Sequence, residues 1–138
     1  MDKLSVCTEL GGMFVKCDFG LGLNNIDLRM SGTGKTFLFS LLKSYMLDND
    51  IVFKSFNYDS SSNDVVVWLS SLSNSGAVAL LDNADLYLDE SLRKAIECKL
   101  DSVIFIVSLK RAELLPKRCK YKSYRLCYTS SSIVCTEV

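Results

Sequence analysis

The residues best suited to chemistry form the run Ser31-Gly32-Thr33-Gly34-Lys35-Thr36. Glycine lets a backbone turn tightly and approach a ligand without a Cβ in the way. Exposed backbone N–H groups in such a turn, followed by the N-terminus of a helix, can surround a phosphate chain. Lys35 would neutralise the outer phosphates, and the Thr36 hydroxyl would hold a magnesium ion that bridges them. The run therefore predicts a phosphate-binding loop.

This segment resembles the Walker A motif of the P-loop NTPases, Gly-x-x-x-x-Gly-Lys-[Ser/Thr]. Arg29 occupies the position of the first glycine, so the half of the motif that contacts phosphates is intact and the half that begins the turn is not. The resemblance implies that ATP and Mg²⁺ are the ligands. The alternative interpretation is a glycine turn that only caps a helix.

A second motif of that family, Walker B, is an apolar run that ends in aspartate, and Val78-Ala-Leu-Leu-Asp82 fits it. Asp82 follows Lys35 by 47 residues, with a further predicted strand and helix between them. This order is similar to the additional-strand division of the family, which includes AAA+ and ABC-type ATPases. The resemblance implies that Asp82 holds magnesium through water, at the sheet edge where ligands of open α/β sheets bind. It also implies that Ser108, which ends the next apolar run, contacts the γ-phosphate or the attacking water.

The residues after Asp82 depart from the family pattern. Members of this division usually carry a glutamate there to deprotonate the attacking water, and this chain has Asn83. An amide can orient water but cannot accept its proton, so we expect hydrolysis to be slow or to depend on a partner. Asp85 could take the proton if the turn brings it inward; otherwise residues 83–85 form a plain polar turn. The chain has no ABC signature of the Leu-Ser-Gly-Gly-Gln type, and too few residues follow Ser108 for an AAA+ lid.

The elements that position these residues follow from the spacing of apolar side chains. Helical spacing predicts a helix over residues 37–47, and capping residues at 59–64 favour a helix over 65–72, although its three consecutive valines are also typical of a strand. Glycine-rich stretches at 11–12 and 20–25 are interpreted as turns. Strands are expected at residues 4–7, 13–17, 26–30, 51–56, 77–81, 102–107, 121–128 and 133–138, and a further helix at 90–99.

Strands that alternate with helices predict an α/β fold. We expect a three-layer P-loop NTPase fold with a mainly parallel central sheet, an N-terminal β ribbon and a C-terminal β hairpin. With 138 residues, of which 49% are hydrophobic, the chain is expected to form a single domain over residues 1–138.

Composition excludes several kinds of chemistry. The chain contains no histidine, which rules out histidine triads, bases and metal ligands. Its six cysteines show no Cys-x-x-Cys spacing and no signal-peptide pattern precedes them, which favours free thiols and a cytoplasmic location. No apolar run reaches the ~18 residues of a membrane span. The formal net charge of zero argues against non-specific binding of the whole chain to nucleic acid or anionic lipid.

The charges are nevertheless uneven. Seven basic residues and one acidic residue lie between Lys110 and Arg125, which makes nucleic acid a candidate partner. Tyr121, Tyr124 and Tyr128 lie among these bases, a pattern typical of a base-stacking strip and also of an amphipathic edge strand. A protein partner or a second copy of the chain could supply an arginine to the nucleotide site. On sequence alone the candidates are Arg93, Arg111, Arg118 and Arg125.

Four functions remain open. The first is an ATP-binding protein that hydrolyses ATP slowly or with a partner. The second is a degenerate module that senses nucleotide or binds protein without turnover. The third is a transferase in which Lys35 and Thr36 present ATP to a small acceptor, and the fourth is a nucleic-acid-linked ATPase that uses the basic segment.

Overall fold

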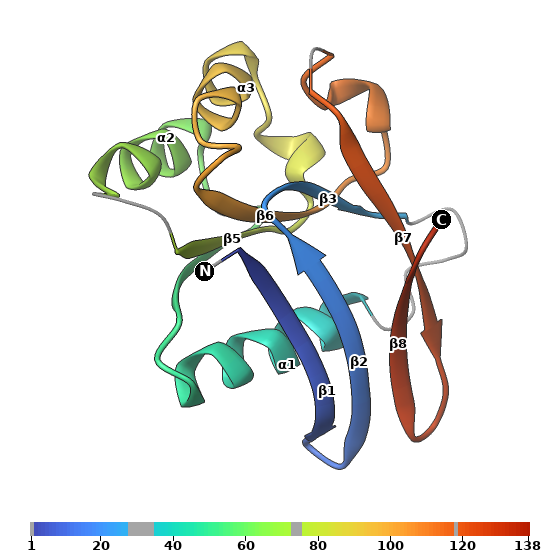
Figure 1. Ribbon diagram of the computed structural model, residues 1–138. Helices are drawn as coiled ribbons and strands as arrows, with labels where there is room; N and C mark the ends of the chain where they lie inside the picture. The colour runs from blue at the N-terminus through green and yellow to red at the C-terminus, as the bar shows by residue number, and fades with distance from the viewer. Residues whose placement is uncertain (1, 28–34, 73–75, 118) are drawn as a thin grey trace.

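A computed structural model describes residues 2–27, 35–72, 76–117 and 119–138 (Figure 1). The elements of these residues are, in chain order, β1 (Lys3–Leu10), β2 (Met13–Gly20), β3 (Gly22–Ile26), α1 (Lys35–Asp48), β4 (Val52–Phe56), α2 (Ser62–Ser71), β5 (Ala77–Leu81), α3 (Glu90–Glu97), β6 (Val103–Ser108), β7 (Tyr121–Tyr128) and β8 (Ser132–Glu137). Short 3-10 turns lie at Ala84–Leu86 and Ala112–Leu114.

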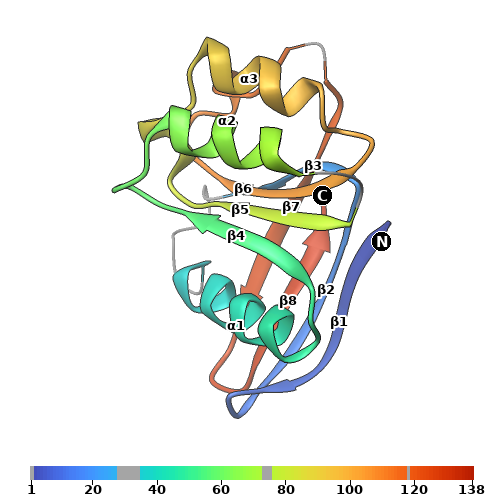
Figure 2. The same ribbon diagram turned by 90° about the vertical axis from the view of Figure 1, so that its left-hand side faces the viewer.

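One mixed sheet joins all the strands of the described residues. Its order is β1-β2-β8-β7-β3-β6-β5-β4, and it is antiparallel at β1–β2 and β7–β8 and parallel at the other pairings. Helix α1 covers one face, and α2 and α3 cover the other (Figure 2). Strands β1, β2, β7 and β8 extend past the other strands on the side of α1, so the sheet curls beside that helix (Figures 1 and 2).

The predicted fold class was wrong. We expected a three-layer P-loop fold in which the ribbon and the hairpin flank a mainly parallel sheet. Instead β2 pairs in parallel with β8, with Val15 opposite Ile133, so ribbon and hairpin are integral parts of a mixed, curled sheet. The reason is burial, because a strand with alternating apolar residues must cover one face. Along β2 that face is buried, and it packs into the same hydrophobic cluster as Leu38 and Leu42 of α1.

The third strand begins earlier than its sequence indicates. The stretch at 20–25 was interpreted as a turn, but Gly22–Ile26 is a fully buried strand, and residues 28–30 of the predicted strand lie outside the described part. Asn24 makes this possible, because its Nδ2 donates to the carbonyls of Gly20, Gly22 and Phe105 at 2.9, 3.3 and 3.0 Å. Its Oδ1 accepts from the Tyr124 hydroxyl at 3.2 Å. A buried asparagine is tolerated when its hydrogen bonds are made.

The helices agree with the capping residues of the sequence. At the start of α2 the Ser61 side chain accepts from Asp64 N at 3.2 Å and Ser61 N donates to Asp64 Oδ2 at 2.9 Å, which is a capping box. These two bonds and the burial of Val65 and Leu69 outweigh the β-propensity of the valines, so the helix prediction at 65–72 is confirmed. Asp89 caps α3 by accepting from Leu92 N at 2.9 Å.

The sheet divides the core into two clusters. The cluster beside α1 contains Leu38, Leu42 and Met46, and the cluster beside α2 and α3 contains Leu69 and Ile96. All six cysteines lie in the described part and are free thiols. No helix of the described residues is long and apolar enough to cross a membrane.

Candidate functional site

Lys35 and Asp82 form a buried ion pair between two motifs of the sequence. Lys35 is the first residue of α1, and Asp82 directly follows β5. The Lys35 Nζ lies 2.8 Å from Asp82 Oδ1, and the two residues are only 8% and 5% exposed. Charges at this depth need close partners, because desolvation costs several kcal/mol per ion. The pair therefore joins the start of α1 to the carboxyl end of β5, the strand next to the edge strand β4.

Hydrogen bonds fix the backbone of Asp82. Asp82 N donates to Phe56 O at 2.9 Å, so the pairing of β4 with β5 continues one residue beyond β5. The hydroxyl of Tyr87 donates to Asp82 O at 2.8 Å and lies 3.3 Å from Phe56 O. Burial, followed by the charges of Asp82 and Asp85, raises the pKa of Tyr87 well above its usual value, so this hydroxyl keeps its proton and remains a donor.

Ser108 also bonds to the carboxylate. The Ser108 Oγ donates to Asp82 Oδ1 at 2.7 Å and accepts from Asn83 N at 3.0 Å, and the residue is fully buried. The register of β5 with β6, Leu81 opposite Val107, explains the contact, since it places the next residue of each strand side by side. One oxygen of Asp82 thus receives both the ammonium of Lys35 and the hydroxyl of Ser108.

Asn83 links this pair to the neighbouring strand. Its backbone is left-handed, with φ 52° and ψ 46°, a conformation that asparagine adopts more readily than most residues. Its Oδ1 accepts from Lys35 Nζ at 3.2 Å, and its Nδ2 donates to Asn57 Oδ1 at 3.0 Å. Both ends of the amide are therefore engaged within the protein.

Asn57 is the member of the site that the sequence analysis missed. It directly follows β4, as Asp82 directly follows β5, and Ser108 is the last residue of β6. Polar residues at the carboxyl ends of three neighbouring parallel strands meet at one sheet edge. This shared position was the signal that could have identified Asn57. We refer to Lys35, Asn57, Asp82, Asn83 and Ser108 as the edge cluster.

The other predicted residues of the site are placed differently. Thr36 lies beside Lys35 in the first turn of α1 and is exposed. Asp85 lies on the 3-10 turn and lines a separate hollow of about 420 Å³ together with Ser61 and Asp89. The structure therefore gives Asp85 a position beside the edge cluster rather than within its hydrogen bonds. Ser31, Gly32, Thr33, Gly34 and Arg29 lie outside the described residues.

The described residues include no group of three or more cysteine, aspartate or glutamate side chains that could hold a metal ion by themselves. Magnesium does not require such a group, because it is commonly bound through one or two protein oxygens together with water and phosphate oxygens. The Asp82 carboxylate and the Thr36 hydroxyl fit that description.

The arginine candidates differ in their contacts. The Arg93 side chain is engaged by contacts within the protein. Its Nε donates to Leu114 O at 2.7 Å, and its Nη1 lies 3.5 Å from Glu90 Oε2. Arg111 and Arg125 are exposed, and Arg118 lies outside the described residues. Only the two exposed arginines of the described part are thus positioned to meet a partner.

The tyrosines of the basic segment do not form one strip. Tyr124 points into the core, and burial raises its pKa to about 12. Tyr128 makes an edge contact with the ring of Phe37, with centroids 6.4 Å apart. Tyr121 is exposed and lines a cavity of about 400 Å³. The base-stacking interpretation was therefore wrong for Tyr124, because β7 alternates between the two faces of the sheet. The alternative of an edge strand was wrong as well, because β7 pairs with β3 on one side and with β8 on the other.

A scan against models of protein families finds none that matches, and a search of curated proteins finds no similar sequence.

Proposed function

We propose that this chain binds ATP together with Mg²⁺ at the edge cluster, and that it hydrolyses ATP slowly or only with a partner. The observation that carries the proposal is the buried ion pair between Lys35 and Asp82. These are the two residues that the motifs assign to phosphate and to metal. They lie 47 residues apart in the sequence, and their charged atoms lie 2.8 Å apart.

Stability alone gives little reason for such a pair. Replacing a buried ion pair by packed apolar side chains is often neutral or stabilising. A lysine at the start of α1 is also unfavourable for the helix dipole, which prefers negative charge there. The first turn of the described helix contains no acidic residue, so Asp82, directly after β5, provides that negative charge. A bound phosphate would provide it in the same place.

Binding would exchange the partners of both charges. Lys35 would turn from the Asp82 carboxylate to a phosphate oxygen, and Asp82 would turn to the hydration shell of the metal. Magnesium neutralises phosphate charge when it is bound, with Thr36 and Asp82 as the residues that would hold it. Because either exchange alone leaves one buried charge without its partner, ATP and Mg²⁺ are expected to bind cooperatively.

The edge cluster offers little help to hydrolysis. Asn83 follows Asp82, and its amide can position water without accepting a proton. That amide is also occupied by Lys35 and Asn57. The neutral Ser108 hydroxyl donates a hydrogen bond to Asp82. Turnover therefore needs a base from elsewhere, either Asp85 after a movement of the turn or a group of a partner.

A nucleotide sensor without turnover is the second candidate function. The chain of hydrogen bonds from Lys35 through Asn83 to Asn57 favours it, because it connects the start of α1 to the end of β4. When the Lys35 ammonium binds a phosphate, Asn83 loses its hydrogen bond from Lys35. The change at the site would then reach Asn57, at the end of β4, through the bond from Asn83. Such a sensor would act on a protein partner or a second copy, and free thiols suit a cytoplasmic location.

A fluorescent ATP analogue tests the binding proposal. We expect saturable binding to the parent in Mg²⁺ and none to a Lys35→Met/Asp82→Leu variant, in which an apolar pair replaces the two charges. Equal binding by the two proteins would refute the proposal. Phosphate release over many turnovers separates the candidates, since the sensor predicts release at the rate of the buffer blank.

A further inference from the structure

A second cavity is lined by Asn25, a residue with a buried polar atom that the edge cluster does not explain. The cavity has a volume of about 400 Å³, within the range of ~300–1,000 Å³ found for ligand pockets. Its polar lining consists of Asn25, Asp27, Lys110, Glu113, Tyr121 and Ser123. Asn25 is only 6% exposed, and its Oδ1 has no hydrogen-bond partner among the residues that the structure describes. Leaving a buried acceptor unpaired is unfavourable, which suggests that a ligand satisfies this amide.

Its neighbour Asn24 shows that the fold can satisfy such a group. The amide of Asn24 makes four hydrogen bonds within the protein, whereas the Oδ1 of Asn25 has no partner in the described part of the chain. The two asparagines alternate on β3, so Asn25 faces the α2 and α3 side of the sheet, where the cavity opens beside Leu109. A leucine would fill that position without an unpaired atom.

The lining around Asn25 has the chemistry of a nucleobase site. A carboxamide presents a donor and an acceptor in one plane, and it pairs with the amino and ring nitrogen edge of adenine. The Tyr121 ring, 43% exposed, provides a stacking wall. Glu113 is exposed at the same cavity and can accept from an exocyclic amino group, while its charge disfavours a phosphate inside. The cavity therefore suits the base and excludes the phosphate.

Phosphates would instead meet the ammonium groups outside. Lys110 lines the cavity and is exposed, and Lys117 and Lys120 are exposed along the same segment. Lys120 directly precedes Tyr121, so a cation and a stacking ring occur together at the start of β7. Alternating base and phosphate contacts are how proteins hold single-stranded nucleic acid.

We infer that this cavity binds an adenine base of a single-stranded nucleic acid, with Asn25 reading the base, Tyr121 stacking on it and Lys110 contacting the adjacent phosphate. The inference is independent of ATP binding at the edge cluster. A Lys35→Met/Asp82→Leu protein that has lost nucleotide binding is expected to retain strand binding, so the two proposals can fail separately.

The test is fluorescence anisotropy of labelled dA12, dC12 and dT12 with the full chain at about 50 mM salt. We expect dA12 to bind about tenfold more tightly than dT12, the discrimination of one paired amide. In Asn25→Leu the preference for dA12 should vanish while folding, followed by circular dichroism, is retained. Equal affinity of the parent for dA12 and dT12, or an unchanged preference in Asn25→Leu, would overturn the inference.

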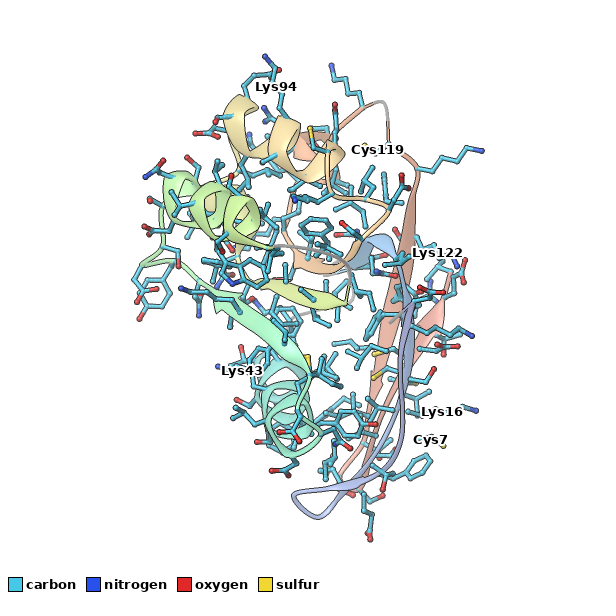
Figure 3. All side chains as sticks on the ribbon, turned by 60° about the vertical axis from the view of Figure 1, so that its left-hand side comes forward. Cys7, Lys16, Lys43, Lys94, Cys119 and Lys122 are labelled. Atoms are coloured by element: carbon cyan, nitrogen blue, oxygen red, sulfur yellow. The ribbon has the colours of Figure 1, made fainter. Side chains whose placement is uncertain are left out.

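Two further variants test the stacking and the phosphate contact separately, and neither changes the buried strand β3. Tyr121→Ala is expected to lower the affinity for all three oligomers about tenfold, because an aromatic ring can stack on any base. Lys110→Glu should weaken the binding of all three oligomers and reduce the salt dependence of that binding. The charge-matched Lys16→Glu should leave the affinities and their salt dependence unchanged. Lys16 is exposed on β2, and Figure 3 shows it well apart from Cys119, the labelled residue nearest to Tyr121 in the sequence apart from Lys122. Equal losses in the two lysine variants would contradict a local site. Displacement of dA12 by an equal concentration of adenosine would contradict the assignment to a strand.

Discussion

The buried ion pair allows a quantitative test by removal of one charge. In Lys35→Met the Asp82 carboxylate keeps the Ser108 hydrogen bond at 2.7 Å but loses the ammonium at 2.8 Å. Breaking a buried pair in this way costs about 3–5 kcal/mol. The Ser108 bond remains, so we expect a loss near the lower end, about 3 kcal/mol of unfolding free energy. At an m-value of about 2 kcal/mol/M the midpoint in urea falls by about 1.5 M.

The double variant provides the control. In Lys35→Met/Asp82→Leu no charge is left buried, but the buried Ser108 hydroxyl loses its acceptor, so the free energy of unfolding should recover part of the loss and come to within about 2 kcal/mol of the parent. Fluorescence of Trp68, whose ring packs on Phe56 with centroids 5.9 Å apart, reports the transition in urea. A single variant as stable as the parent, or a double variant no more stable than the single, would refute the reasoning that the two charges stabilise each other in a dry site.

Three smaller predictions concern single side chains. Asn83→Glu places a base beside Asp82 and should raise phosphate release at least tenfold in a malachite-green assay; an unchanged rate would show that the missing base is not what limits turnover. Tyr87→Phe leaves the Asp82 carbonyl without its hydroxyl donor and should lower the free energy of unfolding in urea by about 1 kcal/mol, while no loss would mean that the bond is not formed in solution. Asp89→Ala should lower it by about 1 kcal/mol at pH 7 through the lost helix cap. The hydrogen bond from the Ser62 hydroxyl holds the pKa of Asp89 below its value in the unfolded chain. The stabilisation by the Asp89 carboxylate is therefore present above the unfolded pKa and is lost as pH falls through the lowered pKa. Urea melts of the parent and the variant should differ less at pH 3 than at pH 7.

Local elements could be predicted because local rules decide them. The helix over 65–72 follows from its capping box and its buried valine and leucine, and the apolar runs before Asp82 and Ser108 are strands because both faces are covered. The mixed sheet could not be predicted in this way. Pairing of β2 with β8 joins segments more than a hundred residues apart, and nothing in either segment specifies the partner.

The early start of β3 shows the same limit on a smaller scale. Two glycines and two asparagines are typical of a turn. Tertiary contacts reverse that preference, because Asn24 finds partners in Phe105 and Tyr124, which lie about 80 and 100 residues further along the chain. Sequence patterns contain no information on such distant partners.

The edge cluster was predictable in part. Lys35 and Asp82 could be named from the resemblance to the Walker motifs, and Asn83 and Ser108 from the positions that the same resemblance assigns to the attacking water and the γ-phosphate. Asn57 has the same position after β4 as Asp82 has after β5, but its role depends on the left-handed turn that directs Asn83 toward it. Asp85 was named by its proximity in sequence, and the 3-10 turn places it beside a different hollow.

The central claim is that the ion pair opens to receive ATP and Mg²⁺ together. Calorimetric titration of ATP into the parent protein, with and without Mg²⁺, tests it most directly. The account predicts saturable binding in Mg²⁺, and binding at least tenfold weaker when the metal is removed. No heat of binding at millimolar ATP in Mg²⁺, or equal affinity with and without the metal, would contradict it.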